Sequence, residues 1–383
     1  MSQSLRDISV LDCHIHYAHP DLMPSLIHIL DEKKIGKFNI VCTPHTSRLS
    51  LVPDALHLKA HYPDRAYVFG GLDISPFFIA PESCGTHFAA YIDTLSAMGC
   101  DGIKMIEGKP NMRKMLMVPP FDSPPYEPYW KKMEEKGIPF IFHLNDPEEF
   151  WDAAGTPDWA KQQGWFYGDG SFINNEVQYT EVLQVIKRHP GLKVIFAHFF
   201  FLSAQLDRLA GYLDRFPNLH IDLTPGIEMY HNFSKDPVKT RDFFLKYQDR
   251  ILYGTDIGAK ALLAAPREKI DPVESGIRTE LVCQFLEIDG EFGIDIARVP
   301  LFGKFGGKFQ GIHLPVEALE KIYHQNFERL AGAKPRLLNP EAIIAECSRL
   351  EQVIPIMGAA QPGEKGDISM AERVRSYFEA HPT

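Results

Sequence analysis

Short apolar runs recur along the chain and alternate with segments of helical periodicity. Most of these runs hold four or five apolar residues without regular polar alternation, which is typical of parallel strands covered on both faces. The eight runs comprise residues 10–16, 38–43, 67–73, 102–107, 139–144, 193–198, 219–224 and 251–256. Eight strands separated by helices predict a (β/α)8 barrel, the TIM barrel of the α/β class.

Apolar stripes between the runs predict the connecting helices. One stripe covers residues 22–30, and another covers residues 182–186 and ends before Pro190. A third helix is expected to have Ser203 as its N-cap and to stop at Pro217. A doubly wound open sheet is the alternative fold. It is disfavoured because the segment after the first strand has no Gly-rich phosphate loop.

The chain is longer than a minimal barrel requires. Three long segments, 108–125, 145–175 and 258–313, follow the carboxyl ends of the fourth, fifth and eighth strands. Barrel enzymes build their active sites at that face, so we expect these segments to be loops that form walls or lids of a site. Two short helical patterns then predict a C-terminal helical extension at residues 334–383, after a barrel domain at residues 1–333.

Charge and composition exclude several classes of partner. The 383 residues carry a net charge of −10 and show no run of Lys or Arg, which argues against nucleic acid and anionic membranes. The six cysteines form no C-x-x-C motif, and Cys13, Cys42 and Cys100, in or beside apolar runs, are expected to be reduced buried thiols. The first strand begins at Val10, which leaves no room for a signal peptide, and no apolar run has transmembrane length. We therefore expect a cytoplasmic protein with a small-molecule substrate, and leave open whether it forms a homo-oligomer.

Ligand-type residues gather where several of the predicted strands end. His14 and His16 lie on one face of the first strand, ~6.7 Å apart along it. His143, His198 and Asp256 end the fifth, sixth and eighth strands. Because strand ends converge at the mouth of a barrel, these side chains are expected to meet around a divalent metal. Imidazoles with one carboxylate favour zinc, with iron, manganese or cobalt as alternatives.

Four motifs of the chain resemble those of the amidohydrolase superfamily. The resemblance spans roughly residues 8–332 and is strongest to amidohydrolase family 2, the branch that includes aminocarboxymuconate semialdehyde decarboxylases. The motifs are Leu-Asp-Cys-His-Ile-His at 11–16, Phe-Ala-His at 196–198, Tyr-Gly-Thr-Asp at 253–256 and Asn-Phe-Glu-Arg-Leu at 326–330. The last is similar to the Asn-x-x-Arg-Leu helix that closes these barrels.

The resemblance implies a role for each strand-end residue. His14, His16, His143 and Asp256 would hold one metal ion per chain, and His198 would act beside a metal-activated water as acid/base or orienting group. Asp256 would also shuttle protons.

Lys104 on the fourth strand has three alternative roles. We expect it to contact the substrate, because an ammonium inside a barrel needs an anionic partner. By the resemblance it could instead be carboxylated and bridge two metals, in which case His143 and His198 would bind the second ion. It could also be a lysine that extends to the barrel rim. His45, Arg48 and Tyr17 are further candidates for substrate binding.

Two reactions fit this predicted site. The first is metal-dependent hydrolysis of a C–N or C–O bond, as in an amide, cyclic imide or lactone, with His198 or Asp256 moving the proton. The alternative is a non-oxidative decarboxylase or hydratase acting on a small carboxylated aromatic or unsaturated acid. Decarboxylation requires a clamp for the substrate carboxylate, and Lys104 and Arg48 are the only obvious cations, so hydrolysis is favoured. A silent binding barrel is a third hypothesis, disfavoured because it would not need the complete ligand set.

Overall fold

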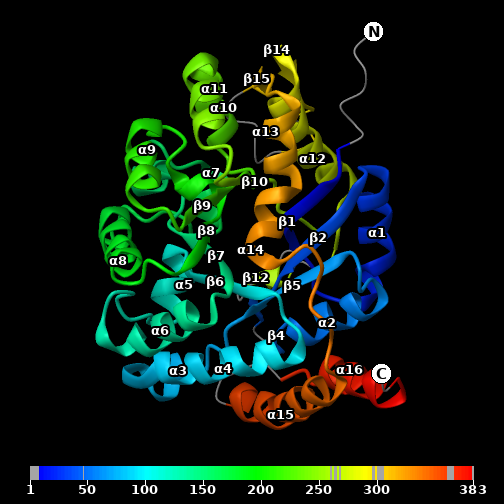
Figure 1. Cartoon of the computed structure of the whole chain (residues 1–383). Coiled ribbons are helices and arrows are strands. Elements are labelled where there is room, and N and C mark those ends of the chain that lie inside the picture. The colour runs from blue at the N-terminus through cyan, green and yellow to red at the C-terminus, as the bar shows by residue number, and fades with distance from the viewer. Residues whose placement is uncertain are drawn as a thin grey trace.

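The centre of the computed structural model is a parallel sheet that curls back on itself (Figure 1). The structure describes residues 8–45, 47–258, 261–262, 265–266, 269–295, 298–299, 306–359 and 366–381. The strand order is β10 (Ile251–Leu252), β9 (Leu219–Asp222), β8 (Lys193–Phe196), β7 (Pro139–Leu144), β6 (Gly102–Gly108), β5 (Ala66–Gly71), β2 (Ile35–Val41), β1 (Val10–His16) and β11 (Ile257–Gly258).

The eighth strand is split, and its two pieces close the barrel. β10 and β11 lie at opposite edges of the sheet, although only residues 253–256 separate them. Backbone bonds join this segment to β1, because Cys13 N donates to Tyr253 O and Asp256 N donates to His14 O, both at 3.0 Å. The predicted (β/α)8 barrel is therefore confirmed. The predicted eighth strand is interrupted because Asp256 has a φ of 56° and leaves the extended conformation.

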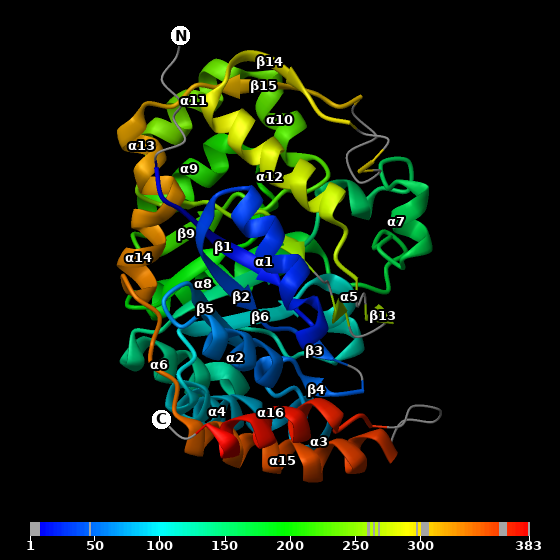
Figure 2. The ribbon, with the colours of Figure 1, turned by 90° about the vertical axis from the view of Figure 1, so that its right-hand side faces the viewer.

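Helices surround the sheet in both views (Figures 1 and 2). The longer ones are α1 (Met23–Glu32), α2 (Val52–His61), α4 (Cys84–Met98), α6 (Glu127–Lys136), α8 (Asn175–Arg188), α9 (Leu206–Arg215), α11 (Pro237–Lys246), α12 (Pro272–Glu287), α15 (Pro340–Ala359) and α16 (Ser369–Ala380). The shorter ones are α3 (Pro76–Ile79), α5 (Pro110–Met115), α7 (Asp158–Gln162), α10 (Met229–Lys235), α13 (Val316–Glu320) and α14 (Asn326–Ala331). Three strand pairs lie outside the barrel: β3 (Pro44–His45) with β4 (Leu49–Ser50), β12 (Ala261–Leu262) with β13 (Ala265–Pro266), and β14 (Asp289–Gly293) with β15 (Lys308–Ile312).

Two predictions about these connections are wrong. Ser203 does not cap α9, which begins at Leu206 with Gln205 in the N-cap position. The Ser203 hydroxyl instead accepts a hydrogen bond from Asn232 Nδ2, at 3.0 Å. Segment 258–313 is not only a loop, since it holds the 16-residue helix α12 and the β14–β15 hairpin.

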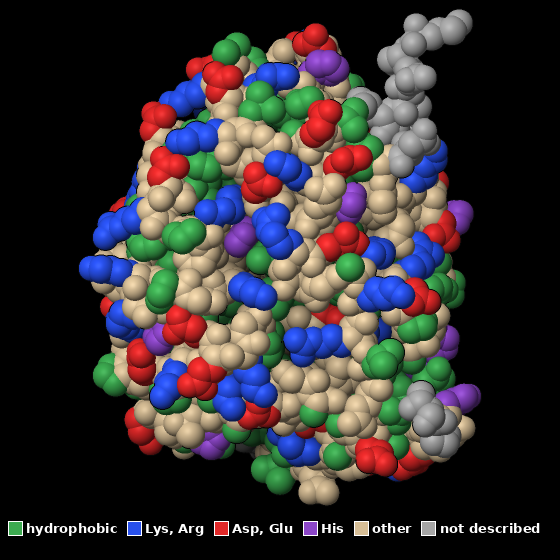
Figure 3. All heavy atoms as spheres, in the orientation of Figure 1, with side chains coloured by type: hydrophobic (Ala, Val, Ile, Leu, Met, Phe, Trp, Pro, Cys, Tyr) green, Lys and Arg blue, Asp and Glu red, His purple; other side chains and the backbone are tan. Residues whose placement is uncertain are grey.

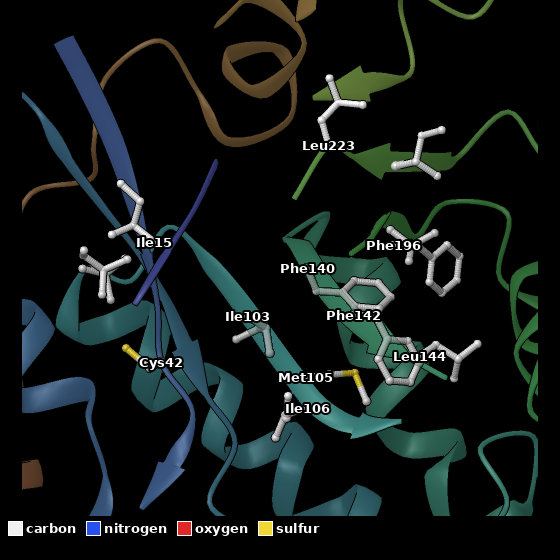
Figure 4. Packing of buried hydrophobic residues seen from close by; sticks show 14 of the residues in the cluster. Ile15, Cys42, Ile103, Met105, Ile106, Phe140, Phe142, Leu144, Phe196 and Leu223 are labelled. Carbon is white, nitrogen blue, oxygen red and sulfur yellow. The ribbon is translucent and has the colours of Figure 1, made fainter. Parts of the chain in front are cut away.

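Buried apolar side chains form an outer and an inner layer. The outer layer lies between the strands and the helices and includes Ile15, Phe142 and Phe196 (Figure 4). The inner layer fills the barrel and includes Phe327 of α14, whose ring centroid lies 5.1 Å from that of Tyr67. The barrel interior is therefore solid at this end, which leaves the opposite end for a pocket.

The last two helices pack against each other and against the barrel helices α2 and α4, at one end of the molecule (Figures 1 and 2). A division into units at residue 333 stays a prediction. On the face drawn in Figure 3, basic and acidic side chains are interspersed. Among the described residues, no helix is both long enough and apolar enough to cross a membrane.

Candidate metal centre and catalytic pocket

Three of the predicted ligands converge at the open end of the barrel. Ligand atoms of His14, His16 and Asp256 all lie within 4.8 Å of one another. His16 Nε2 is 3.1 Å from Asp256 Oδ1. A register irregularity in β1 between Asp12 and Ile15 accompanies this arrangement, and such irregularities commonly redirect side chains beside active sites. The three side chains come from β1 and from the gap between β10 and β11.

A buried carboxylate fixes the orientation of the His14 ring. His14 Nδ1 lies 2.9 Å from Asp222 Oδ2, so Nδ1 carries the proton and Nε2 faces the cluster. The other oxygen of Asp222 accepts hydrogen bonds from the backbone N–H groups of His198, at 2.8 Å, and Thr224, at 3.1 Å. Asp222 therefore couples the first, sixth and seventh strands of the barrel.

Asp12 bonds the backbone of the two chain segments that carry the cluster. Its Oδ1 accepts hydrogen bonds from the backbone N–H groups of His14, at 3.0 Å, and Thr255, at 3.2 Å, and its Oδ2 accepts one from the Thr255 hydroxyl. Burial raises the pKa of Asp12 to about 7. Asp12 thus joins the two chain segments that carry the cluster.

His198 lies in a left-handed turn directly after β8. Residues 198–201 all have φ between 54° and 59°, a region that non-glycine residues rarely adopt. His198 Nδ1 lies 3.2 Å from the Thr224 carbonyl, which assigns the proton to Nδ1 and leaves the Nε2 lone pair free to accept a proton. Burial and the neighbouring His143 lower the pKa of His198 well below its ordinary value. The residue is a neutral imidazole beside the cluster, with its ring centroid 5.9 Å from that of His14.

His143 lies in the same pocket but outside the close cluster. Its ring centroid is 4.9 Å from that of His198, whereas its Nε2 lies 3.3 Å from Asp146 Oδ1. Burial lowers the pKa of His143 to about 4. Its role as a fourth metal ligand stays a prediction.

Lys104 projects directly into the site. Its Nζ lies 3.0 Å from His14 Nε2, and burial lowers its pKa to about 8. Of its three predicted roles, extension to the rim is wrong, because the side chain is buried at the cluster.

The three other predicted substrate ligands are not among the described residues that line the pocket. Arg48 donates to Asp54 Oδ1, at 2.9 Å, and to the Ala18 carbonyl, at 2.7 Å, so its guanidinium is already paired inside the protein. His45 Nδ1 accepts a hydrogen bond from the Ser47 backbone N–H. The Tyr17 hydroxyl is buried, and burial raises its pKa.

Aromatic side chains form much of the pocket wall. Phe150, Trp159 and Trp165 come from segment 145–175, as the prediction of a wall at this position requires. The Trp159 and Trp165 ring centroids lie 5.7 Å apart, and Phe201 closes another side. Such a wall suits a small organic ligand with an apolar part.

The donor set fits a divalent metal. His14 and His16 offer imidazole nitrogens, Asp256 offers a carboxylate, and all three are buried, as expected for zinc or a related ion. Arg278 of α12 lies 3.5 Å from Asp256 Oδ2 and holds this carboxylate from outside the cluster. Lys104 Nζ places a cation 3.0 Å from His14 Nε2, the nitrogen that faces the cluster.

Comparison with known protein families decides the relationship. The profile of the amidohydrolase family matches residues 87–332. The chain belongs to the amidohydrolase family. No curated protein sequence matches this amidohydrolase.

Solved structures show the same fold at low sequence identity. Amidohydrolase II is 16% identical, with 84% of this chain and 99% of that chain covered and a TM-score of 0.51. A TIM-barrel protein from Bordetella bronchiseptica is also 16% identical, with 85% and 99% covered and a TM-score of 0.50. The complex of 2,6-dihydroxybenzoate decarboxylase with 2,6-dihydroxybenzoate is 14% identical, with 84% and 98% covered and a TM-score of 0.50. These similarities establish that the amidohydrolase is a TIM barrel.

Sequence reasoning missed two residues of this candidate site. Lys109 follows β6 and lines the pocket, but it lies in a Pro- and Met-rich stretch with no motif around it. Arg278 lies in the middle of α12, within a segment predicted to be a loop. A helical pattern in that segment was the one signal that could have pointed to Arg278.

Proposed function

We propose that this chain hydrolyses a C–N or C–O bond of a small organic substrate, such as an amide, cyclic imide or lactone. One divalent metal ion assists the reaction, and zinc is the preferred candidate for that ion. The observation that supports this proposal is the convergence of His14, His16 and Asp256 in an apolar pocket that also contains the neutral imidazole of His198.

The side chains divide into holding and proton-transfer roles. His14, His16 and Asp256 hold the ion, with His143 as a proposed fourth ligand. When bound, such an ion polarises the substrate carbonyl and lowers the pKa of a nearby water. His198 accepts the proton of the attacking water at Nε2 and returns it to the leaving nitrogen or oxygen. Asp256 serves as the second proton carrier, because its carboxylate lies at the cluster.

Hydrolysis is preferred because one of the two described lysines that line the pocket is already paired with a carboxylate, which leaves Lys104 to meet a substrate carboxylate. Arg48 is paired with Asp54 and is not among the described lining residues. Lys104 favours the second candidate, a decarboxylase or hydratase, because its Nζ beside His14 is placed to meet a substrate carboxylate. A carboxylated Lys104 would instead bring a second metal ion.

Metal content and reaction type test the proposal. We expect elemental analysis of the purified protein to give one divalent ion per chain, and His16→Ala to lose both the ion and the activity. A panel of aryl amides, imides and lactones should be hydrolysed, while arenecarboxylates should release no CO2. CO2 release from the carboxylates without hydrolysis would replace this proposal with the lyase. Two ions per chain with a carboxylated Lys104 would replace the mononuclear centre.

Cellular location and assembly belong to the same proposal. The enzyme is proposed to be cytoplasmic, with a C-terminal helical extension at residues 334–383 whose helices α15 and α16 pack on the barrel helices α4 and α2.

A further inference from the structure

Lys109 and Asp146 form a closed charge pair in the pocket wall. Lys109 Nζ lies 2.7 Å from Oδ1 and 2.6 Å from Oδ2 of Asp146, and both side chains are buried although both line the pocket. The Tyr167 hydroxyl donates to Asp146 Oδ2, at 2.5 Å. Both oxygens of Asp146 lie within hydrogen-bond distance of the Lys109 ammonium, so the pair is a buried ion pair in which the carboxylate balances the ammonium.

The rest of the ammonium faces an aromatic ring. Lys109 Nζ lies 4.4 Å from the Trp165 ring centroid, a cation–π distance. The ammonium is thus satisfied by a carboxylate and an indole of the same segment, 145–175. Phe150 and Trp159 continue this wall with further aromatic faces. At this place the pocket presents rings and a charge pair whose net charge is zero.

A carboxylate brought against this wall would lose its hydration and meet the negative charge of Asp146. An uncharged ring would pack on the tryptophans without that cost. Discrimination by a like charge is a common way for a site to reject a competing ligand.

We propose that Asp146 is a specificity-determining residue: by neutralising Lys109 it makes this wall select an uncharged aromatic group of the substrate and reject a carboxylate there. This proposal depends on the proposed function in one respect, because it takes the pocket to be the substrate site. It concerns the part of the substrate that lies against Lys109 and Trp165, and it leaves the reacting bond to the metal cluster.

Two matched probes test this selection by binding. Acetanilide and 4-acetamidobenzoate share an aryl amide and differ by one carboxylate on the ring. Isothermal titration is performed on metal-loaded protein that also carries His198→Asn, because this substitution suppresses hydrolysis of the two amides. With Lys109 and Asp146 unchanged, here called the wild-type pair, it should show acetanilide binding at least tenfold more tightly, and the variants below are compared in the same background. Asp146→Asn keeps the shape and frees the Lys109 charge, so it should reverse the preference by at least tenfold in favour of 4-acetamidobenzoate. The double variant Lys109→Gln/Asp146→Asn has a neutral pair and should again prefer acetanilide.

Lys109→Gln alone supplies an independent check in case Asp146→Asn does not fold. It leaves the negative charge in the wall, so its preference for acetanilide should equal or exceed that of the wild type. The proposal is overturned if the wild type binds both probes equally, prefers the carboxylate or binds neither, or if a folded Asp146→Asn variant keeps the wild-type preference. Because binding is measured without turnover, failure of the panel to be hydrolysed would contradict the proposed function and not this selection.

Discussion

His198→Asn separates proton transfer from metal binding. Asparagine tolerates positive φ better than most residues, so it suits the φ of 55° at this position, and its amide can still donate to the Thr224 carbonyl. The substitution removes the Nε2 acceptor while leaving His14, His16 and Asp256 in place. Loss of a general acid–base group lowers turnover by roughly two to four orders of magnitude, which corresponds to about 3–5 kcal/mol in the activation barrier.

The assay measures kcat and metal content on the same preparations. We expect His198→Asn to keep its metal and to lose turnover by that factor. The control is His189→Asn. His189 is also a buried histidine, but its Nδ1 bonds Glu134 Oε2, at 2.9 Å, and it is not among the described residues that line the pocket. It should keep both metal and kcat. If His198→Asn loses the metal, His198 is a ligand. If it keeps the metal and full activity, the acid/base lies elsewhere, first at Asp256.

Three further predictions concern buried ionisable side chains. Asp222→Asn weakens the acceptor that orients His14, so metal affinity should fall by roughly 10–100-fold in a competition titration with a chelator; unchanged affinity would show that Asp222 only supports the fold. Burial and the nearby Glu149 and Asp146 raise the pKa of Glu228 to about 8, so the folded protein retains a proton that the unfolded chain releases above its ordinary pKa of 4.5. Wild-type stability should therefore fall by about 1.4 kcal/mol per pH unit relative to Glu228→Gln between pH 5.5 and 7.5 in urea titrations, and parallel stability curves would contradict this shift. Lys59→Met leaves the buried Asp101 without its cation, 2.6 Å away in the wild type, and should cost ~3–5 kcal/mol of unfolding free energy; a loss below 1 kcal/mol would show that Asp101 is not charged in the fold.

Local patterns of the sequence predicted the barrel well because each strand is a continuous buried run. The observed bounds of β1 and β7 equal the predicted ones, 10–16 and 139–144. The cluster of His14, His16 and Asp256 could be predicted from the sequence for the same reason, since topology alone brings strand ends together.

Interactions that form only after the helices and strands pack together could not be predicted from the sequence. Arg48 was predicted to meet a substrate, but its partner Asp54 lies on α2, and only the packing of that helix brings the two together. The N-cap of α9 was misplaced because the Ser203 hydroxyl has a partner 29 residues later, Asn232. A pairing across that separation leaves no trace in a local pattern.

Packing of the phenylalanines after β8 also determines where His198 lies. Four residues with positive φ, 198–201, cost roughly 4–8 kcal/mol in backbone strain, and none of them is glycine or asparagine. Phe200 stacks on Phe196 with ring centroids 3.8 Å apart, and Phe199 stacks on Phe244 at 5.7 Å. Each buried phenylalanine contributes about 1.5–3 kcal/mol, which is enough in sum to offset the strain. The aromatic run therefore positions His198, because without its burial the turn that presents this imidazole to the pocket would relax.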